Sequence, residues 1–214
     1  MGKDALVIPR EVLFGDEEFQ GFLPLGQRDL VSVILENHSF HPRGDELEKN
    51  RDLQQVIPYV WIVNPLEMKA FLYKRAINSS EAEGEFTEER YLHKYSGGVG
   101  GHIDRDTEEG VEDPITQAMM RELREEVDMA VYPEPRVIGY INDDSDELGR
   151  VHFGIVAIAK TTGSVRVKSS EGLEDGAFYS AEEVDSIFSN PENQVENWTK
   201  FSWSFVKDYM MFSQ

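Results

Sequence analysis

The chain has 214 residues, 40% of them hydrophobic and 11% aromatic, which suits a folded globule with one main domain and an elaboration. Its formal net charge of -20 at pH 7 argues against nucleic acid or an anionic membrane surface as a partner, since no Lys/Arg cluster offsets the acidic field. Cysteine is absent, which excludes disulfides and cysteine-based zinc sites and fits the reducing cytoplasm, where we expect this protein. No stretch reaches the roughly 18 apolar residues of a membrane span, and the N-terminus shows no secretory signal.

The predicted elements begin with a mixed N-terminal region. Residues 1–50 combine short apolar runs, a Gly/Pro-bearing turn and a charged loop, and we interpret them as an N-terminal extension packed on a main domain over 51–214. In 56–63 and 68–73 the content of β-branched and aromatic residues is high, and the Asn-Pro pair between these runs predicts a turn, so a hairpin is expected. The polar and acidic segment 78–89 predicts an exposed loop.

A helix is predicted after the glycine-rich stretch that follows this loop. Asp113 is a favourable N-cap and Pro114 a favourable first residue, so the helix should run from Pro114 to about Val127. The remaining chain predicts strands over 137–141, 151–159 and 164–167 and closing helices over 181–188 and 195–212. Aromatic residues at helical spacing in the last helix are expected to lie in the core: Trp198, Phe201, Phe205, Tyr209 and Phe212.

Three glutamates of the predicted helix continue its apolar stripe. Glu122, Glu125 and Glu126 each lie seven positions after an apolar residue of the same helix. Desolvating an unpaired carboxylate costs several kcal/mol, so a cation is expected over this patch. Arg121 can reach Glu125 at i,i+4, but one arginine cannot neutralise three acids. The pattern therefore predicts a bound divalent metal; the alternative is a solvated helix face with i,i+4 ion pairs.

The stretch around this helix resembles the Nudix box. The sequence Arg-Glu-Leu-Arg-Glu-Glu at 121–126 matches the second half of the box completely, and Gly101 stands at its first glycine. There are three departures: Asp113 replaces the first glutamate, Asp128 replaces the last glycine, and an insertion over 105–110 lengthens the spacing between the two halves. We expect this insertion to bulge out of the glycine loop without displacing the helix.

The wider stretch 57–156 looks like the MutT-related group of predicted phosphoesterases within the Nudix hydrolase superfamily. The resemblance implies an α/β fold, a Nudix-type α/β/α sandwich with a mixed β-sheet. It implies a metal-dependent hydrolase that cleaves a phosphoanhydride bond in a nucleoside diphosphate linked to another group. The metal would be Mg2+ or Mn2+, which prefer oxygen ligands. The resemblance assigns the metal to Glu122, Glu125, Glu126 and the Gly101 carbonyl, and it makes Arg121 the residue that orients Glu125.

A further acid normally comes from a later loop in this family. Either Glu171 or Glu174 could complete the metal site or act as general base. The alternative is that both are loop acids in a very acidic protein.

The glycine loop supplies further candidates for substrate binding. Gly100, Gly101 and His102 lie next to the predicted metal site, and His102 could contact substrate or metal or be a hydrogen-bonded structural residue. Basic residues that flank the expected cleft are candidate phosphate contacts, with surface solvation as the alternative: Arg75, Lys94 and Arg150.

Two other functions compete with hydrolysis. A non-catalytic module of the same fold would bind a nucleotide and regulate something, but such modules typically lose the paired glutamates that this chain keeps. The Gly-His pair at 101–102 also resembles isopentenyl diphosphate isomerase, which uses a catalytic cysteine that this chain lacks. The substrate is expected to be a small phosphorylated molecule; recognition of its leaving group depends on strands, loops or a homodimer partner that no motif locates.

Overall fold

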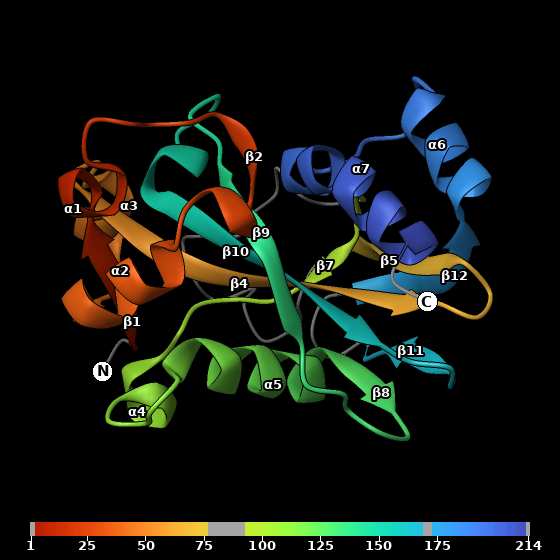
Figure 1. Ribbon diagram of the computed structural model, residues 1–214, viewed down its shortest axis with the longest axis horizontal. Coiled ribbons are helices and arrows are strands. Elements are labelled where there is room, and N and C mark those ends of the chain that lie inside the picture. The colour runs from red at the N-terminus through yellow and green to blue at the C-terminus, as the bar shows by residue number, and fades with distance from the viewer. Residues whose placement is uncertain (1–2, 77–92, 169–172, 213–214) are drawn as a thin grey trace.

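The computed structural model describes residues 3–76, 93–168 and 173–212. Within these residues a ten-stranded mixed sheet lies between helices on its two faces (Figure 1), which confirms the α/β/α sandwich expected from the sequence. None of the helices in the described part of the chain is long and apolar enough to cross a membrane. The main path of the sheet is, in spatial order, β12 (Leu173–Ser180), β5 (Lys69–Arg75), β4 (Leu53–Asn64), β10 (His152–Lys160), β9 (Arg136–Asn142) and β2 (Gly21–Pro24).

The N-terminal region contributes directly to this sheet. Strand β2 pairs with β9, and a further N-terminal strand, β1, pairs antiparallel with β4. The strands off the main path are β1 (Asp4–Pro9), β3 (Ser39–Pro42), β6 (Tyr95–Ser96) and β7 (Gly98–Val99). A separate two-stranded sheet joins β8 (Val127–Met129) to β11 (Val165–Val167).

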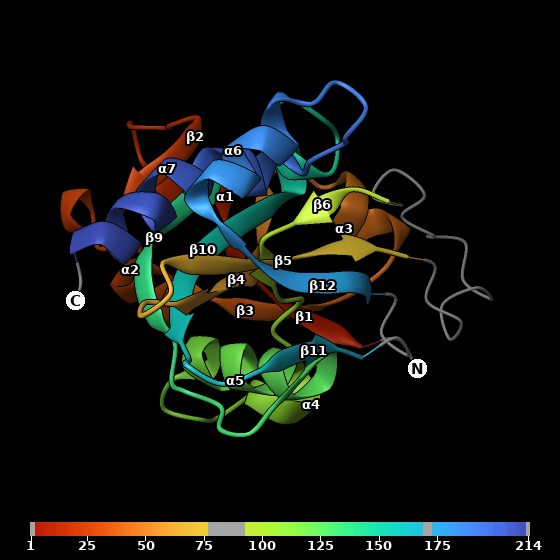
Figure 2. The same ribbon diagram turned by 90° about the vertical axis from the view of Figure 1, so that its right-hand side faces the viewer.

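Helices cover both faces and one end of the sheet. Figure 1 shows α4 and α5 below the sheet and α6 and α7 above it, and Figure 2 shows the same two layers from the side. The α-helices are α1 (Arg10–Phe14), α2 (Leu30–Asn37), α3 (Asp45–Lys49), α4 (Arg105–Glu108), α5 (Pro114–Glu126), α6 (Ala181–Ser189) and α7 (Asn197–Phe212). Short 3-10 turns are η1 (Leu25–Gln27) and η3 (Gly149–Val151).

Most elements predicted beyond residue 50 are present. The hairpin is confirmed by the antiparallel pairing of β4 with β5, in which Val63 faces Ala70. Helix α5 begins after Asp113, whose Oδ1 accepts a hydrogen bond from the Thr116 N–H at 2.9 Å, as the predicted N-cap requires. The segment 78–89, predicted to be an exposed loop, falls outside the described residues.

Strand β4 runs through the centre of the fold and is buried on both faces. Successive side chains of a strand point to opposite faces, so alternate residues of β4 enter two different cores. The core under α5 contains Val56, Val60 and Ile62. The core under α6 and α7 contains Tyr59, Trp61 and Val63. The strand therefore fixes both helical layers relative to the glycine loop that follows β7.

The prediction that the aromatic stripe of α7 lies in the core is wrong in part. Phe205 is 38% exposed and Phe212 is 84% exposed, whereas the neighbouring stripe that contains Trp203 and Val206 is buried. The buried sheet face carries a Tyr59 hydroxyl and a Trp61 indole N–H that need hydrogen-bond partners. Tyr59 Oη lies 2.7 Å from Thr199 Oγ1, and Trp61 Nε1 donates to Ser202 Oγ at 2.9 Å. Helix α7 therefore turns Thr199 and Ser202 toward the sheet.

Candidate active site

Helix α5 places two of the three predicted carboxylates against the fold. Glu122 is 8% exposed and Glu126 is 9% exposed. The expectation that Glu125 shares this stripe is wrong, because its side chain is 51% exposed. In an α-helix, residues seven positions apart differ by about 20° in their direction around the helix axis. A residue seven positions after one at the edge of the apolar stripe can therefore point outside the stripe. Glu125 consequently lies at the rim of the site.

Arg121 holds this part of the site together through four partners. Its Nη1 donates to Glu122 Oε1 at 2.6 Å and to Glu125 Oε2 at 2.9 Å. Its Nη2 donates to the His102 carbonyl at 2.7 Å, and its Nε donates to Glu108 Oε1 at 2.9 Å. The guanidinium thus ties the helix to the glycine loop and fixes the direction of two carboxylates.

Glu126 has no contact with Arg121 among the hydrogen bonds of the described residues. Burial raises the pKa of Glu126 to about 8, even though the nearby charge of Arg75 and a hydrogen bond from the Gly100 backbone oppose that shift. Burial likewise raises the pKa of Glu122 to about 7, despite the proximity of Arg121. Within the described part of the chain, Glu126 Oε2 is buried without a hydrogen-bond partner. Such an oxygen is costly unless a cation or donor reaches it.

The glycine loop packs closely on these carboxylates. A Cβ atom at Gly100 would overlap the Pro58 carbonyl oxygen of β4. A Cβ atom at Gly101 would lie 2.8 Å from Glu122 Oε1. At Gly100 only glycine leaves room beside the backbone of β4, whereas a Cβ atom at Gly101 would displace the Glu122 carboxylate.

The segment 105–110 is more than the bulge expected from the sequence. It starts with α4, and the Glu108 side chain is fully buried. Glu108 accepts hydrogen bonds from Arg121 and, at 2.7 Å, from the Asp104 N–H. Asp113, by contrast, is the N-cap of α5. The sequence analysis missed Glu108 because 105–110 is an insertion relative to the Nudix box. No pattern in the sequence indicates that an acid in this insertion contacts Arg121.

The basic candidates are held by protein groups. Arg75 Nε donates to Glu196 Oε1 at 2.6 Å, and Glu196 is buried. The positive charge of Arg75 still acts on Glu126, because it opposes the rise in the pKa of that carboxyl group. Arg150 Nε donates to the Asp144 carbonyl at 3.0 Å. This hydrogen bond does not link Arg150 to α5.

The later acids and His102 have different surroundings. Glu174 lies on β12 with a side chain that is 42% exposed, 3.3 Å from His93 Nδ1. Glu171 falls outside the described residues. The Nε2 atom of His102 lies 2.9 Å from Gln55 Oε1 and 3.4 Å from His152 Nε2. Burial lowers the pKa of His102 well below its ordinary value.

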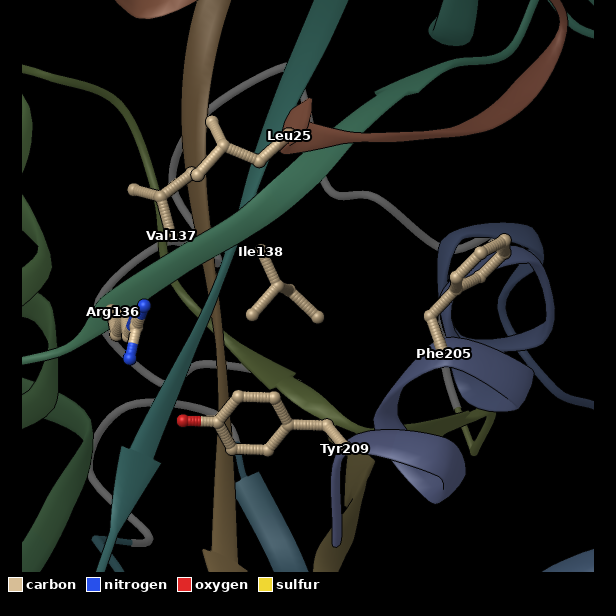
Figure 3. A pocket seen from close by; sticks show the side chains of 6 residues that line it. All are labelled: Leu25, Arg136, Val137, Ile138, Phe205 and Tyr209. Carbon is tan, nitrogen blue, oxygen red and sulfur yellow. The ribbon is translucent and has the colours of Figure 1, made fainter. Parts of the chain in front are cut away.

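A surface pocket of about 370 Å³ lies away from this site, between β9, η1 and α7 (Figure 3). Its lining is mainly apolar and consists of Leu25, Arg136, Val137, Ile138, Phe205 and Tyr209. Helices α7 and α5 cover opposite faces of the sheet, so the pocket is not part of the carboxylate site on α5.

One sequence relative and several solved structures are similar to this chain. No protein-family model matches the chain. Protein YmaB of Bacillus subtilis is 30% identical over 217 aligned positions, which cover 94% of this chain and 96% of that protein. The crystal structure of Tm1382, assigned to the Nudix hydrolases, has a TM-score of 0.74 at 25% identity and covers 96% of this chain and 98% of that one. The chain belongs to the Nudix hydrolase superfamily.

The matches also extend through the N-terminal region of this Nudix hydrolase, because both alignments cover nearly the whole chain. A more distant structure has the same fold: a bifunctional NMN adenylyltransferase/ADP ribose pyrophosphatase from Francisella tularensis. It has a TM-score of 0.51 at 12% identity and covers 73% of this chain and 41% of that one. Membership of this family makes the protein a Nudix-type hydrolase.

Proposed function

We propose that this Nudix hydrolase cleaves a phosphoanhydride bond in a nucleoside diphosphate linked to another group, and that it needs Mg2+ or Mn2+. The ion would be held by Glu122, Glu125, Glu126 and the carbonyl of Gly101. Hard oxygen ligands of this kind suit Mg2+ and Mn2+, which bind few carboxylates and leave room for substrate phosphates. When bound, such an ion supplies charge neutralisation for the phosphates and activation of a water nucleophile.

The observation that carries this proposal is the state of Glu126. Its Oε2 atom is buried without a hydrogen-bond partner among the described residues, and burial raises its pKa to about 8. A carboxyl group left in this condition destabilises the fold when it ionises. A cation beside Glu126 and Glu122 removes that penalty, and the donor set of the site fits one.

The other residues orient and anchor the acids. Arg121 directs the carboxylates of Glu122 and Glu125, and Glu108 together with the His102 carbonyl keeps the guanidinium in place. The close approach of Gly101 to Glu122 supports a role for its backbone in the same site.

Substrate contact is proposed for Arg75, together with an acid from the β12 region. Arg75 is close enough to the carboxylates to influence the pKa of Glu126, and Glu196 holds its guanidinium in one direction. Arg75 is therefore suited to a phosphate group. Glu174 at the start of β12, or Glu171 before it, is the proposed general base.

The test is a screen of nucleotide sugars, dinucleoside polyphosphates, NAD, ADP-ribose and damaged nucleotides, with release of phosphate or nucleoside monophosphate as the readout. Activity is expected with Mg2+ or Mn2+, should disappear with excess chelator and should return when the metal is restored. Full turnover in excess chelator would contradict the metal requirement. Binding of a nucleotide without any product would favour a non-catalytic module instead.

A further inference from the structure

His102 belongs to a group of three side chains of the types that ligate metals. Glu48 of α3, His102 of the glycine loop and His152 at the start of β10 each offer one ligand atom, and these atoms lie within 4.8 Å of one another. The three residues come from segments far apart in the sequence. Nothing in the Nudix box describes them, since two of the three lie outside it.

The pairing of strands brings these residues together. Strands β4 and β10 are parallel, and their register places His152 beside Gln55. The Gln55 side chain donates from Nε2 to Glu48 Oε1 at 3.1 Å and accepts at Oε1 from His102 Nε2 at 2.9 Å. One amide thus connects two of the candidate ligands and stands beside the third.

The hydrogen bonds of His152 prepare it as a ligand. Its Nδ1 atom lies 2.8 Å from the Leu148 carbonyl, which can only accept, so the neutral ring carries its proton on Nδ1 and keeps a lone pair on Nε2. A backbone carbonyl at the distal ring nitrogen is one of the common partners of a metal-binding histidine. His152 is 7% exposed, and the contact of its Nε2 is a 3.4 Å approach to His102 Nε2, long for a hydrogen bond. The approach of His102 therefore gives the buried lone pair on His152 Nε2 no well-placed hydrogen-bond donor.

The distance between the two rings matches coordination. Imidazole nitrogens bind zinc at about 2.0–2.1 Å, so two of them on one tetrahedral ion are separated by about 3.3 Å. The observed separation of the Nε2 atoms is 3.4 Å. Glu48 is half-buried at the end of a short helix, and rotation of its side chain can bring the carboxylate to the same ion.

We propose that Glu48, His102 and His152 bind one transition metal ion of the zinc class, at a site separate from the carboxylates of α5. Two imidazoles and one carboxylate form a ligand set that favours such ions over Mg2+ and leaves one position for water or a substrate atom. On binding, the ion replaces the proton of His102 Nε2, which leaves to solvent or moves to Nδ1.

The ion would link α3, the glycine loop and β10. It would also act next to the hydrolytic site, because the His102 carbonyl accepts a hydrogen bond from Arg121 at 2.7 Å. An ion that holds the His102 ring would therefore also hold the His102 carbonyl, which accepts the hydrogen bond from Arg121. The proposal does not rest on the hydrolytic function, and its test needs no substrate.

The experiment uses the full chain after chelator treatment and dialysis, with excess Mg2+ present to occupy the carboxylates of α5. Zn2+ binding is measured by calorimetry and by metal analysis after gel filtration, and Co2+ replaces Zn2+ for absorption spectra. The wild type should bind one equivalent of Zn2+ and give the visible bands of four-coordinate Co2+. Both His152→Gln and Glu48→Gln should weaken Zn2+ binding by at least about tenfold, since even indirect partners of a metal matter at that level.

Two controls separate this site from others. Glu126→Gln removes a carboxylate of α5 and should leave Zn2+ binding unchanged. His38→Gln removes a half-buried histidine at the end of α2 and should also leave it unchanged. Loss of Zn2+ binding in Glu126→Gln would place the ion on α5 and overturn the proposal. Binding by both His152→Gln and Glu48→Gln with wild-type affinity would also overturn it. Should His152→Gln fail to fold, Glu48→Gln alone decides, because Glu48 is only half-buried.

Discussion

The fully buried side chain of Glu108 forms an ion pair with Arg121, with 2.9 Å between Glu108 Oε1 and Arg121 Nε. The pair joins α4 to α5, and the same guanidinium reaches the carboxylates of Glu122 and Glu125. Residues 105–110 therefore belong to the architecture of the site.

This pair predicts that Glu108→Gln lowers both turnover and stability. The amide keeps the shape but loses the charge that holds Arg121, so we expect turnover to fall by about 10–100-fold and the free energy of unfolding to fall by about 1–3 kcal/mol. Chemical denaturation and steady-state kinetics measure the two effects. The control is Glu109→Gln, its exposed neighbour. If both variants behave alike, Glu108 has no role in positioning Arg121.

The close approach of Gly101 to Glu122 gives a second prediction. In Gly101→Ala the added Cβ would lie 2.8 Å from Glu122 Oε1 and push the carboxylate aside. The apparent affinity for Mg2+ should fall by roughly tenfold, while the protein stays folded. Gly26→Ala is the matched control, because its Cβ would meet no atom within 4 Å. Unchanged Mg2+ dependence in Gly101→Ala would remove the glycine loop from the proposed site.

The raised pKa values predict how stability depends on pH in the metal-free protein. Glu122 and Glu126 have pKa values of about 7 and about 8 in the folded state, against 4.5 for an unperturbed glutamate. The folded state thus retains protons that the unfolded state releases, so the free energy of unfolding should fall as pH rises from about 4.5 to about 8. The loss should be on the order of a few kcal/mol. Added Mg2+ should restore stability at pH 8.

Thermal melts across this pH range test the prediction. Glu126→Gln should flatten the profile and melt higher than the wild type at pH 9, since it carries no charge to bury. The exposed variant Glu109→Gln should retain the wild-type slope. A wild-type profile that rises with pH over the same range would contradict buried, protonated carboxyl groups.

The acids of the β12 region give a fourth prediction. Removal of the general base should lower kcat by about 100-fold or more while leaving Mg2+ affinity nearly unchanged. Glu174→Gln and Glu171→Gln are compared with the exposed variant Glu182→Gln. A large loss in only one of the first two assigns the base. If neither differs from Glu182→Gln, the base lies elsewhere.

The sequence predicted the features that depend on local patterns. Asp113 and Pro114 define the start of α5, and the β-branched and aromatic content of 56–63 predicted the strand that β4 forms. Features that depend on distant contacts were missed or wrong. Glu108 reaches Arg121 only because α4 folds back, and the orientation of α7 depends on hydrogen-bonding groups of β4 that no helical periodicity reveals.

The cluster of Glu48, His102 and His152 shows the same limit. Its members come from a short helix, a loop and a strand, and the parallel register of β4 and β10 brings them together. In the sequence, the glycine-rich motif draws attention to His102 but not to Glu48 or His152. The carboxylates of α5 were found because they occupy one helix, where spacing in sequence determines spacing in the structure.

The central claim is that the buried carboxylates of α5 bind the metal on which hydrolysis depends. The most direct measurement is turnover of the best substrate from the screen by the wild type and Glu126→Gln at saturating Mg2+. The variant keeps the shape of the side chain but loses a charged ligand, so turnover should fall by at least about 100-fold while the fold is retained. Near-normal turnover by Glu126→Gln would contradict the claim and would leave the site without its proposed metal ligand.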